Sequence, residues 1–76
     1  MDTRQLAAFC IVVEQRSFSQ AAEQLGVTQP AVSLQIRSLE KRLGLLLLDR
    51  SGRRVEPTDA GRRLYRSAQR DRKSVV

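Results

Sequence analysis

The fold is decided by the stretch from residue 17 to residue 44, which reads SFSQAAEQLGVTQPAVSLQIRSLEKRLG. Ser17 followed three residues later by Gln20 is the pattern of a capping box, which begins a helix. Gly26 ends that helix, because glycine tolerates the positive φ of a helix C-terminus. Thr28 then caps the next helix. Two helices joined by so tight a turn indicate a helix-turn-helix.

The helix that begins after Thr28 has two chemically different faces. Pro30 lies in its first turn, where the missing N–H costs nothing, and Gly44 ends it after about Leu43. On a helical wheel its apolar residues form one narrow stripe that we expect to face the core: Val32, Ile36, Leu39 and Leu43. The exposed face carries an amide, a hydroxyl and a guanidinium one turn apart, beside two apolar side chains: Gln29, Ser33 and Arg37, with Pro30 and Leu34.

This exposed face suits the major groove of duplex DNA. Gln29 can pair with adenine, and Arg37 can pair with guanine. Pro30 or Leu34 can touch a thymine methyl group. The helix N-terminus behind Thr28 adds backbone N–H groups that suit a phosphate. The alternative interpretation is that these are ordinary solvated positions on an amphipathic helix.

One acidic residue limits how this helix can be used. Glu40 falls on the same side of the wheel as Gln29, and a carboxylate there would repel a phosphate. We therefore expect only the first two turns of the helix to enter the groove.

The residues before this helix predict the rest of a small core. Residues 2–15 form a helix, with Asp2 as its cap and Gln5 as the second half of a capping box. Its apolar residues recur with helical spacing and are expected to face inward: Leu6, Phe9, Cys10 and Val13. Cys10 is therefore interpreted as a small core residue. Four more apolar residues are expected to fill the inner face of the short helix and its turn: Ala21, Ala22, Leu25 and Val27.

Beyond Gly44 the periodicity changes. The run Leu45–Leu48 is interpreted as a buried strand edge, and Ser51-Gly52 as the turn of a β-hairpin. Pro57 ends the hairpin and Thr58 caps a fourth helix. The hairpin arginines form either a soluble tip or a wing that straddles the DNA backbone or minor groove: Arg50, Arg53 and Arg54. The fourth helix has an apolar stripe that fades into charge: Leu64, Tyr65 and Ala68.

The composition excludes several classes of function. The 76 residues include no histidine and one cysteine, which removes His-dependent catalysis, Cys/His zinc sites and internal disulfides. We therefore expect no enzyme, no cofactor and no metal. The net charge of +6 falls entirely in residues 39–76, which indicates a polyanionic partner, nucleic acid ahead of a membrane surface. No apolar stretch reaches the roughly 20 residues that span a bilayer, and no signal peptide is present, so we expect the cytoplasm.

Several spaced motifs resemble a known family. The run SFSQAAEQLGVTQPAVSLQIRSLEKRLGLLLLDR, followed by VEPTDAG, resembles the N-terminal domain of LysR-type bacterial transcriptional regulators, from about Leu6 to Tyr65. The resemblance implies a mainly α fold: a winged helix-turn-helix with a three-helix core, a small β-hairpin wing and a C-terminal linker helix that pairs two chains. We accordingly expect a DNA-binding domain at residues 1–57 and the start of a linker and dimerisation helix at residues 58–76.

The resemblance also implies roles for individual residues. It puts one group from the helix-turn-helix at the DNA: Thr28, Gln29, Pro30, Ser33, Leu34 and Arg37. It puts Arg50 and Arg53 in the wing, where the basic tip also includes Arg54. It places the fourth helix at the dimer seam, which we assign to its apolar stripe: Leu64, Tyr65 and Ala68. The expected partner is double-stranded DNA with an inverted repeat, bound by a homodimer.

The sequence departs from the family pattern in three places. Leu48 stands where family members usually have Phe. The linker helix loses its apolar stripe after Ala68. The 76 residues stop where the family continues into a large effector-binding domain, so we expect that domain to be absent from this chain, and the resemblance does not imply inducer-responsive regulation for it. The chain is then a DNA-binding fragment, a truncated product or a freestanding short relative.

Sequence-specific DNA binding by a transcriptional regulator is the leading hypothesis. The alternative is an interaction module whose fourth helix pairs with a full-length relative and sequesters it. Membrane binding by the basic C-terminal helix is disfavoured, because its apolar stripe is short and lacks Trp and Phe. An enzyme is the least favoured class.

Overall fold

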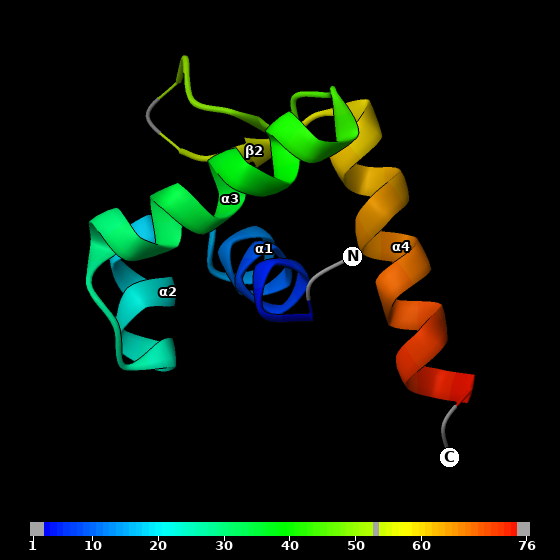
Figure 1. Cartoon of the computed structure of the whole chain (residues 1–76), viewed down its shortest axis with the longest axis horizontal. Helices are drawn as coiled ribbons and strands as arrows, with labels where there is room; N and C mark the ends of the chain where they lie inside the picture. Colours follow the sequence, from blue (N-terminus) through cyan, green and yellow to red (C-terminus); the bar gives the residue numbers. More distant parts are fainter. Residues whose placement is uncertain (1–2, 53, 75–76) are drawn as a thin grey trace.

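The computed structural model describes residues 3–52 and 54–74, with side chains as far as residue 70. Within these residues the chain forms a mostly helical fold with a small antiparallel hairpin (Figure 1). The elements in chain order are α1 Thr3–Gln15, α2 Phe18–Leu25, α3 Gln29–Leu43, β1 Leu48–Asp49, β2 Glu56–Pro57 and α4 Asp59–Ser74. The expected mainly α, winged helix-turn-helix architecture is confirmed.

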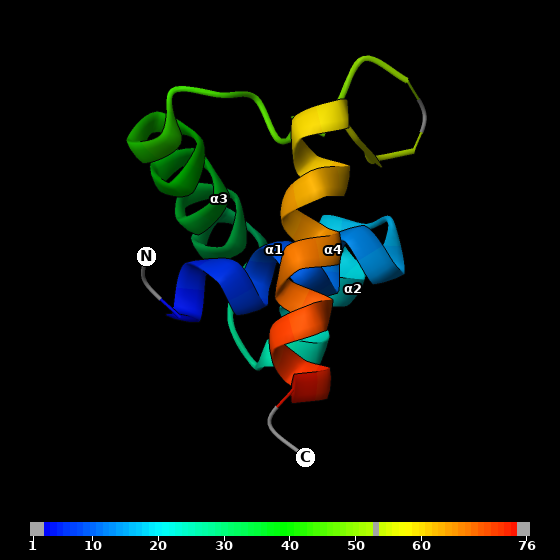
Figure 2. The ribbon, with the colours of Figure 1, turned by 90° about the vertical axis from the view of Figure 1, so that its right-hand side faces the viewer.

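Helix α1 lies at the centre and contacts α2, α3 and α4 (Figures 1 and 2). Its most deeply buried residues are Ala8, Phe9, Cys10 and Val12. The expected core role of Cys10 is confirmed, whereas Leu6 and Val13 are only half-buried. Because α1 is packed on three sides, it buries a wider arc than the single stripe that periodicity predicts. The centre of its buried face therefore differs from the one that the sequence pattern predicted. The expected cap, Asp2, lies outside the described residues.

The helix-turn-helix forms as its capping residues predict. The Ser17 hydroxyl accepts a hydrogen bond from the Gln20 backbone N–H at 3.2 Å, and Gly26 ends α2 with φ of 71°. The Thr28 hydroxyl accepts from the Ala31 N–H at 3.3 Å. Gly44 ends α3 with φ of 68°. The stripe on α3 is buried from Val32 through Ile36 to Leu39, as expected.

Three apolar residues expected to be inside are exposed instead. Leu25 and Val27 lie at the turn between α2 and α3, and Leu43 lies in the last turn of α3. Val27 is 49% exposed, so the expectation that it fills the turn was wrong. A helical wheel assumes that a packing partner runs along the whole helix, and the core covers only the middle of α2 and α3.

The hairpin is shorter than its sequence suggests. Leu48 pairs with Pro57 and Asp49 pairs with Glu56. Pro57 was expected to end the hairpin, but it is the last residue of β2. Its missing N–H costs nothing there, because the next residue, Thr58, donates the hydrogen bond to the Leu47 carbonyl at 3.0 Å.

The predicted strand edge Leu45–Leu48 is only half correct. Leu47 and Leu48 are buried in the core, whereas Leu45 and Leu46 are exposed, Leu46 by 71%. Leu48 is 4% exposed, so it anchors the hairpin where the family pattern has Phe. The segment after α3 is therefore an exposed apolar loop that leads into a two-residue strand.

Helix α4 is joined tightly to the base of the hairpin. The Thr58 hydroxyl accepts from the Gly61 N–H at 3.1 Å, which confirms the cap. A Cβ at Gly61 would lie 2.1 Å from the Leu47 carbonyl oxygen, so only glycine fits there. From this junction α4 runs across α1 (Figure 2), with Ala68 in the core. The division at residue 57 into two units remains a prediction. No described helix is both long and apolar enough to cross a bilayer.

Candidate nucleic-acid interface

The exposed face of α3 holds the side chains expected to read bases. Gln29, Pro30 and Arg37 are exposed, and Ser33 is half-buried. Leu34 is also exposed, by 66%, so its apolar side chain is available on this face. The structure therefore brings these five residues together on one surface, with Thr28 at its N-terminal end.

Gln29 is oriented by a neighbour that sequence reasoning missed. The Ser19 hydroxyl on α2 donates a hydrogen bond to Gln29 Oε1 at 3.3 Å. This contact links residues ten positions apart in sequence, and no local pattern marks it. It restrains the Gln29 amide through its oxygen, and the two N–H groups of the amide take no part in this contact.

Glu40 does not face outward as the helical wheel implied. Its Oε2 accepts hydrogen bonds from the backbone N–H groups of Leu47 at 2.8 Å and Leu48 at 3.3 Å. Its side chain is 11% exposed. The reason given for limiting groove entry to the first two turns was therefore wrong, because this carboxylate is turned toward the chain's own backbone.

Arg50 lies between two elements of the core. Its guanidinium carbon is 4.7 Å from the centre of the Phe18 ring on α2. Its Nη2 is 4.0 Å from Glu40 Oε1 on α3. The Arg50 side chain is 33% exposed, so this predicted wing cation is partly built into the fold.

The turn of the hairpin is organised by an acid. The Ser51 hydroxyl and N–H donate to Asp49 Oδ1 at 2.6 and 2.9 Å, and these bonds hold the Asp49 pKa below its ordinary value of 3.8. Arg54 is exposed near the tip. Arg53 lies outside the described residues. The described part of the wing therefore offers Arg50 and Arg54 to an anion.

A hollow of about 660 Å³ separates α3 from the wing. Arg37 and Glu40 line it from α3, and Asp49 and Arg50 line it from the hairpin segment, together with the exposed Leu46. The two guanidinium groups attract a phosphate and the Glu40 and Asp49 carboxylates repel it, so a phosphate would lie beside Arg37 or Arg50, and the apolar Leu46 suits a sugar. The hollow thus joins the predicted helix and wing residues into one surface.

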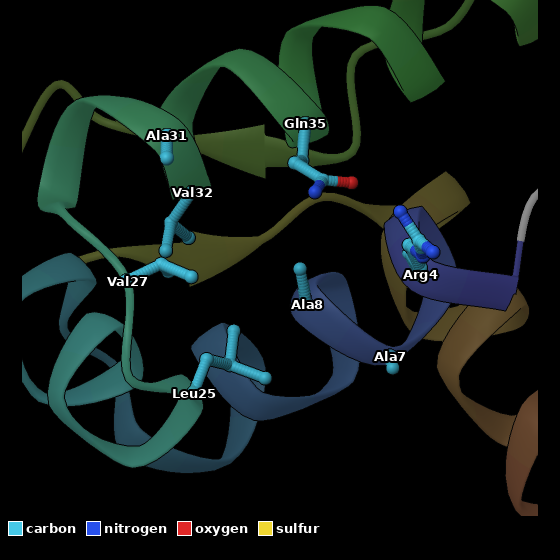
Figure 3. Close-up of a pocket in the computed structure, with 8 residues that line it drawn as sticks. All are labelled: Arg4, Ala7, Ala8, Leu25, Val27, Ala31, Val32 and Gln35. Atoms are coloured by element: carbon cyan, nitrogen blue, oxygen red, sulfur yellow. The ribbon is translucent and has the colours of Figure 1, made fainter.

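A second groove, of about 240 Å³, lies between α1, the turn after α2, and α3 (Figure 3). Leu25 and Val27 lie at one end and Arg4 at the other, with Gln35 between them on α3. The groove is mainly apolar. Among the described residues no group of three or more His, Cys, Asp or Glu side chains could hold a metal ion.

The residues assigned to the dimer seam pack within their own chain. Leu64 and Tyr65 are half-buried against the core, and Ala68 is 8% exposed. The Tyr65 hydroxyl donates to Glu14 Oε2 on α1 at 2.9 Å. The outer side of α4 is instead covered by exposed arginines: Arg62, Arg63, Arg66 and Arg70.

Residues 3–62 match the family described as bacterial regulatory helix-turn-helix protein, lysR family. The chain belongs to this family. An uncharacterized HTH-type transcriptional regulator of Azotobacter vinelandii, from the ibpB-leuC intergenic region, is 51% identical to this LysR-type chain over 70 residues. That match covers 92% of the chain and 49% of the relative. The regulator BenM of Acinetobacter baylyi is 44% identical over 68 residues, 90% of the chain and 22% of BenM.

Solved structures agree with this assignment. The BenM DNA-binding domain, solved in a complex with catB site 1 DNA, superposes on the LysR-type chain with a TM-score of 0.92 and 41% identity. The match covers 99% of this chain and 83% of that one. The chain spans about half the length of the Azotobacter vinelandii relative and about a fifth of BenM. These relatives are transcriptional regulators, and the winged helix-turn-helix fold is shared with them.

Proposed function

We propose that this LysR-type domain binds duplex DNA at a specific sequence in the cytoplasm and thereby regulates transcription. Helix α3 enters the major groove, and the wing lies on the backbone or in the adjacent minor groove. The observation that carries the proposal is the hollow between α3 and the wing, lined by Arg37 and Arg50, beside the exposed face of α3. The similarity to a BenM domain solved with DNA supports it. The function requires no bond-making chemistry.

The residues divide into two roles. Those on α3 choose the sequence by contacting base edges: Gln29, Pro30, Ser33, Leu34 and Arg37. Thr28, at the helix N-terminus, and the wing arginines contact the phosphate backbone and make the affinity depend on salt: Arg50, Arg53 and Arg54. Replacing Gln29 or Ser33 with Ala therefore costs about 1–3 kcal/mol at particular base pairs only.

We further propose that two copies bind an inverted repeat and pair through α4. Because Ala68 is buried in the single chain, the pairing surface in this proposal consists of the exposed parts of the half-buried Leu64 and Tyr65. Pairing of this kind would place the two copies of α3 on successive turns of the duplex.

A protein-interaction module is the second candidate, in which α4 pairs with a full-length relative and sequesters it. The observation that favours it is the arginine-covered outer side of α4. Two copies of that surface repel each other, whereas a relative with carboxylates at the facing positions would attract it.

Selection from a random duplex library at near-physiological salt tests the proposal. Enrichment of an inverted repeat supports specific reading by a dimer, and enrichment of a single half-site supports specific reading by a monomer. Absence of enrichment, together with binding that disappears as salt rises, would contradict the proposal. Co-elution with a full-length relative in the absence of DNA would then support the interaction module.

A further inference from the structure

We propose that Glu40 is a positioning residue for DNA binding, which fixes the wing against α3 through the Leu47–Leu48 backbone and through Arg50. This inference rests on the proposed function, since it concerns how the same surface is held before DNA arrives. Glu40 itself does not touch the DNA in this proposal. It acts by holding other groups at a set distance from the α3 face.

The backbone contacts carry the first step. Leu47 and Leu48 are the residues at which the exposed loop enters the core and β1 begins. Their N–H groups both donate to Glu40 Oε2. A carboxylate that is 11% exposed requires such donors, because burial of an ionised group without hydrogen bonds is costly. The start of the wing is therefore tied to the fourth turn of α3.

Arg50 carries the second step. Its guanidinium is placed between the Phe18 ring and Glu40 Oε1, so α2 and α3 both restrain it. A guanidinium has five N–H donors, and the partly exposed Arg50 keeps some of them for the hollow that it shares with Arg37. The position of Arg50 beside the hollow is thus set in the free protein, which lowers the ordering that DNA binding requires.

This arrangement predicts a change in DNA affinity opposite to the one that simple electrostatics predicts when a negative charge is removed. Removing an acid close to a phosphate-binding surface removes a repulsion and should tighten binding. If Glu40 instead positions the wing, its removal should weaken binding even though the domain becomes more positive. The sign of the change therefore separates the two possibilities.

The test compares Glu40→Gln with Glu23→Gln. Both substitutions remove one negative charge with little change of shape, and Glu23 is exposed on α2 with no side-chain bond among the described contacts. Binding is measured by fluorescence anisotropy on the duplex enriched from the random library and on a scrambled duplex. We expect Glu40→Gln to bind both about 5- to 30-fold more weakly, with base preference unchanged. Glu23→Gln should bind as the unaltered chain does, or slightly more tightly.

Amide hydrogen exchange in the absence of DNA gives a second readout. Glutamine at position 40 is a neutral and weaker acceptor, so the Leu47 and Leu48 amides should exchange about 5-fold faster, while the Val32 and Ile36 amides on α3 should not change. If binding is unchanged or tighter, or if these two amides keep their protection, the inference is overturned while the proposed function stands. If the unaltered chain enriches no duplex, the proposed function fails, and the exchange rates alone decide whether Glu40 fixes the wing.

Arg50→Lys keeps the test decisive if Glu40→Gln does not fold. Lysine retains the charge but lacks the planar group that lies on Phe18. Binding several-fold weaker than that of the unaltered chain, together with faster exchange of the Leu47 and Leu48 amides in the absence of DNA, supports positioning by the contacts of Glu40 and Phe18 with Arg50. Binding equal to that of the unaltered chain would show that Arg50 acts only as a charge, which overturns the inference.

Discussion

The helix-turn-helix at residues 17–44 and the wing segment at residues 45–57 are built on different principles. In the first, each helix begins and ends at a residue whose own chemistry specifies the boundary, such as Ser17 or Gly44. In the second, the strands have two residues each, and the start of β1 is held by Glu40, which belongs to α3. The comparison teaches that local chemistry specifies the reading helix, whereas tertiary contacts specify the wing beside it.

The largest expected effect is a difference in stability between alanine substitutions at two adjacent leucines of the wing segment. Leu47→Ala should lower the free energy of unfolding by about 2–5 kcal/mol, because Leu47 is 1% exposed and its loss leaves a cavity. Leu46→Ala, one residue earlier, should change it by less than about 0.5 kcal/mol. Urea unfolding followed by circular dichroism measures both. Equal losses would mean that the loop is buried as a continuous strand, and the contrast between the two regions would fail.

A second large effect is expected at the joint between wing and α4. Gly61→Ala should cost about 3 kcal/mol or more, since the new Cβ would meet the Leu47 carbonyl oxygen. Gly52→Ala in the hairpin turn is the matched control, because the nearest atom to its Cβ is the Arg54 carbonyl oxygen at 4.0 Å. Thermal unfolding of the two variants gives the comparison. A stable Gly61→Ala variant would show that the wing can shift away from α4.

Two serines at the start of α2 separate the effects on folding from the effects on base recognition. Ser17→Ala should cost about 1 kcal/mol of stability through loss of the cap. Ser19→Ala should leave stability nearly unchanged, but should reduce discrimination at the base pair read by Gln29 about 3- to 10-fold, because the Gln29 amide loses its restraint. Competition binding with single-base variants of the selected duplex checks this. Ser19→Thr, which retains the hydroxyl, should restore discrimination, and a Gln29→Ala background should abolish the effect.

The smallest expected effect depends on pH. The pKa of Asp49 is lower in the folded chain than its ordinary value of 3.8, so its ionised form favours the folded turn. The contribution is complete above pH 3.8 and is lost as pH falls through the lowered pKa. A pH titration followed by NMR should show the Ser51 amide signal moving in that acidic range. Asp49→Asn should remove this movement, and a Ser51 signal that titrates above pH 5 would contradict the assignment.

The parts of the fold that the sequence predicted correctly are those with local causes. The caps at Ser17, Thr28 and Thr58 needed no knowledge of tertiary structure. The exposed Leu25, Val27 and Leu43 were wrongly placed, because periodicity does not report where a packing partner ends. The two strands are shorter than predicted for the same reason, because the sequence pattern does not report where their pairing ends.

The candidate site was predicted as a set of residues but not as an arrangement. The α3 face could be drawn on a wheel, whereas the role of Glu40 and the contact between Ser19 and Gln29 arise only when separate elements meet. The inward packing of Ala68 was missed because an apolar stripe does not say which surface it covers. Individual DNA contacts, including that of Arg53, remain predictions.

The single cysteine allows unfolding of the domain to be measured by chemical labelling. The reduced thiol of Cys10 is 2% exposed in the centre of the molecule, on the helix that three others surround. A thiol reagent can reach it only after the core has unfolded, so the rate of labelling measures how often the domain unfolds. Conversely, a cysteine introduced on the surface would be modified first, which allows a dye to be attached to the wing without altering the native sulfur.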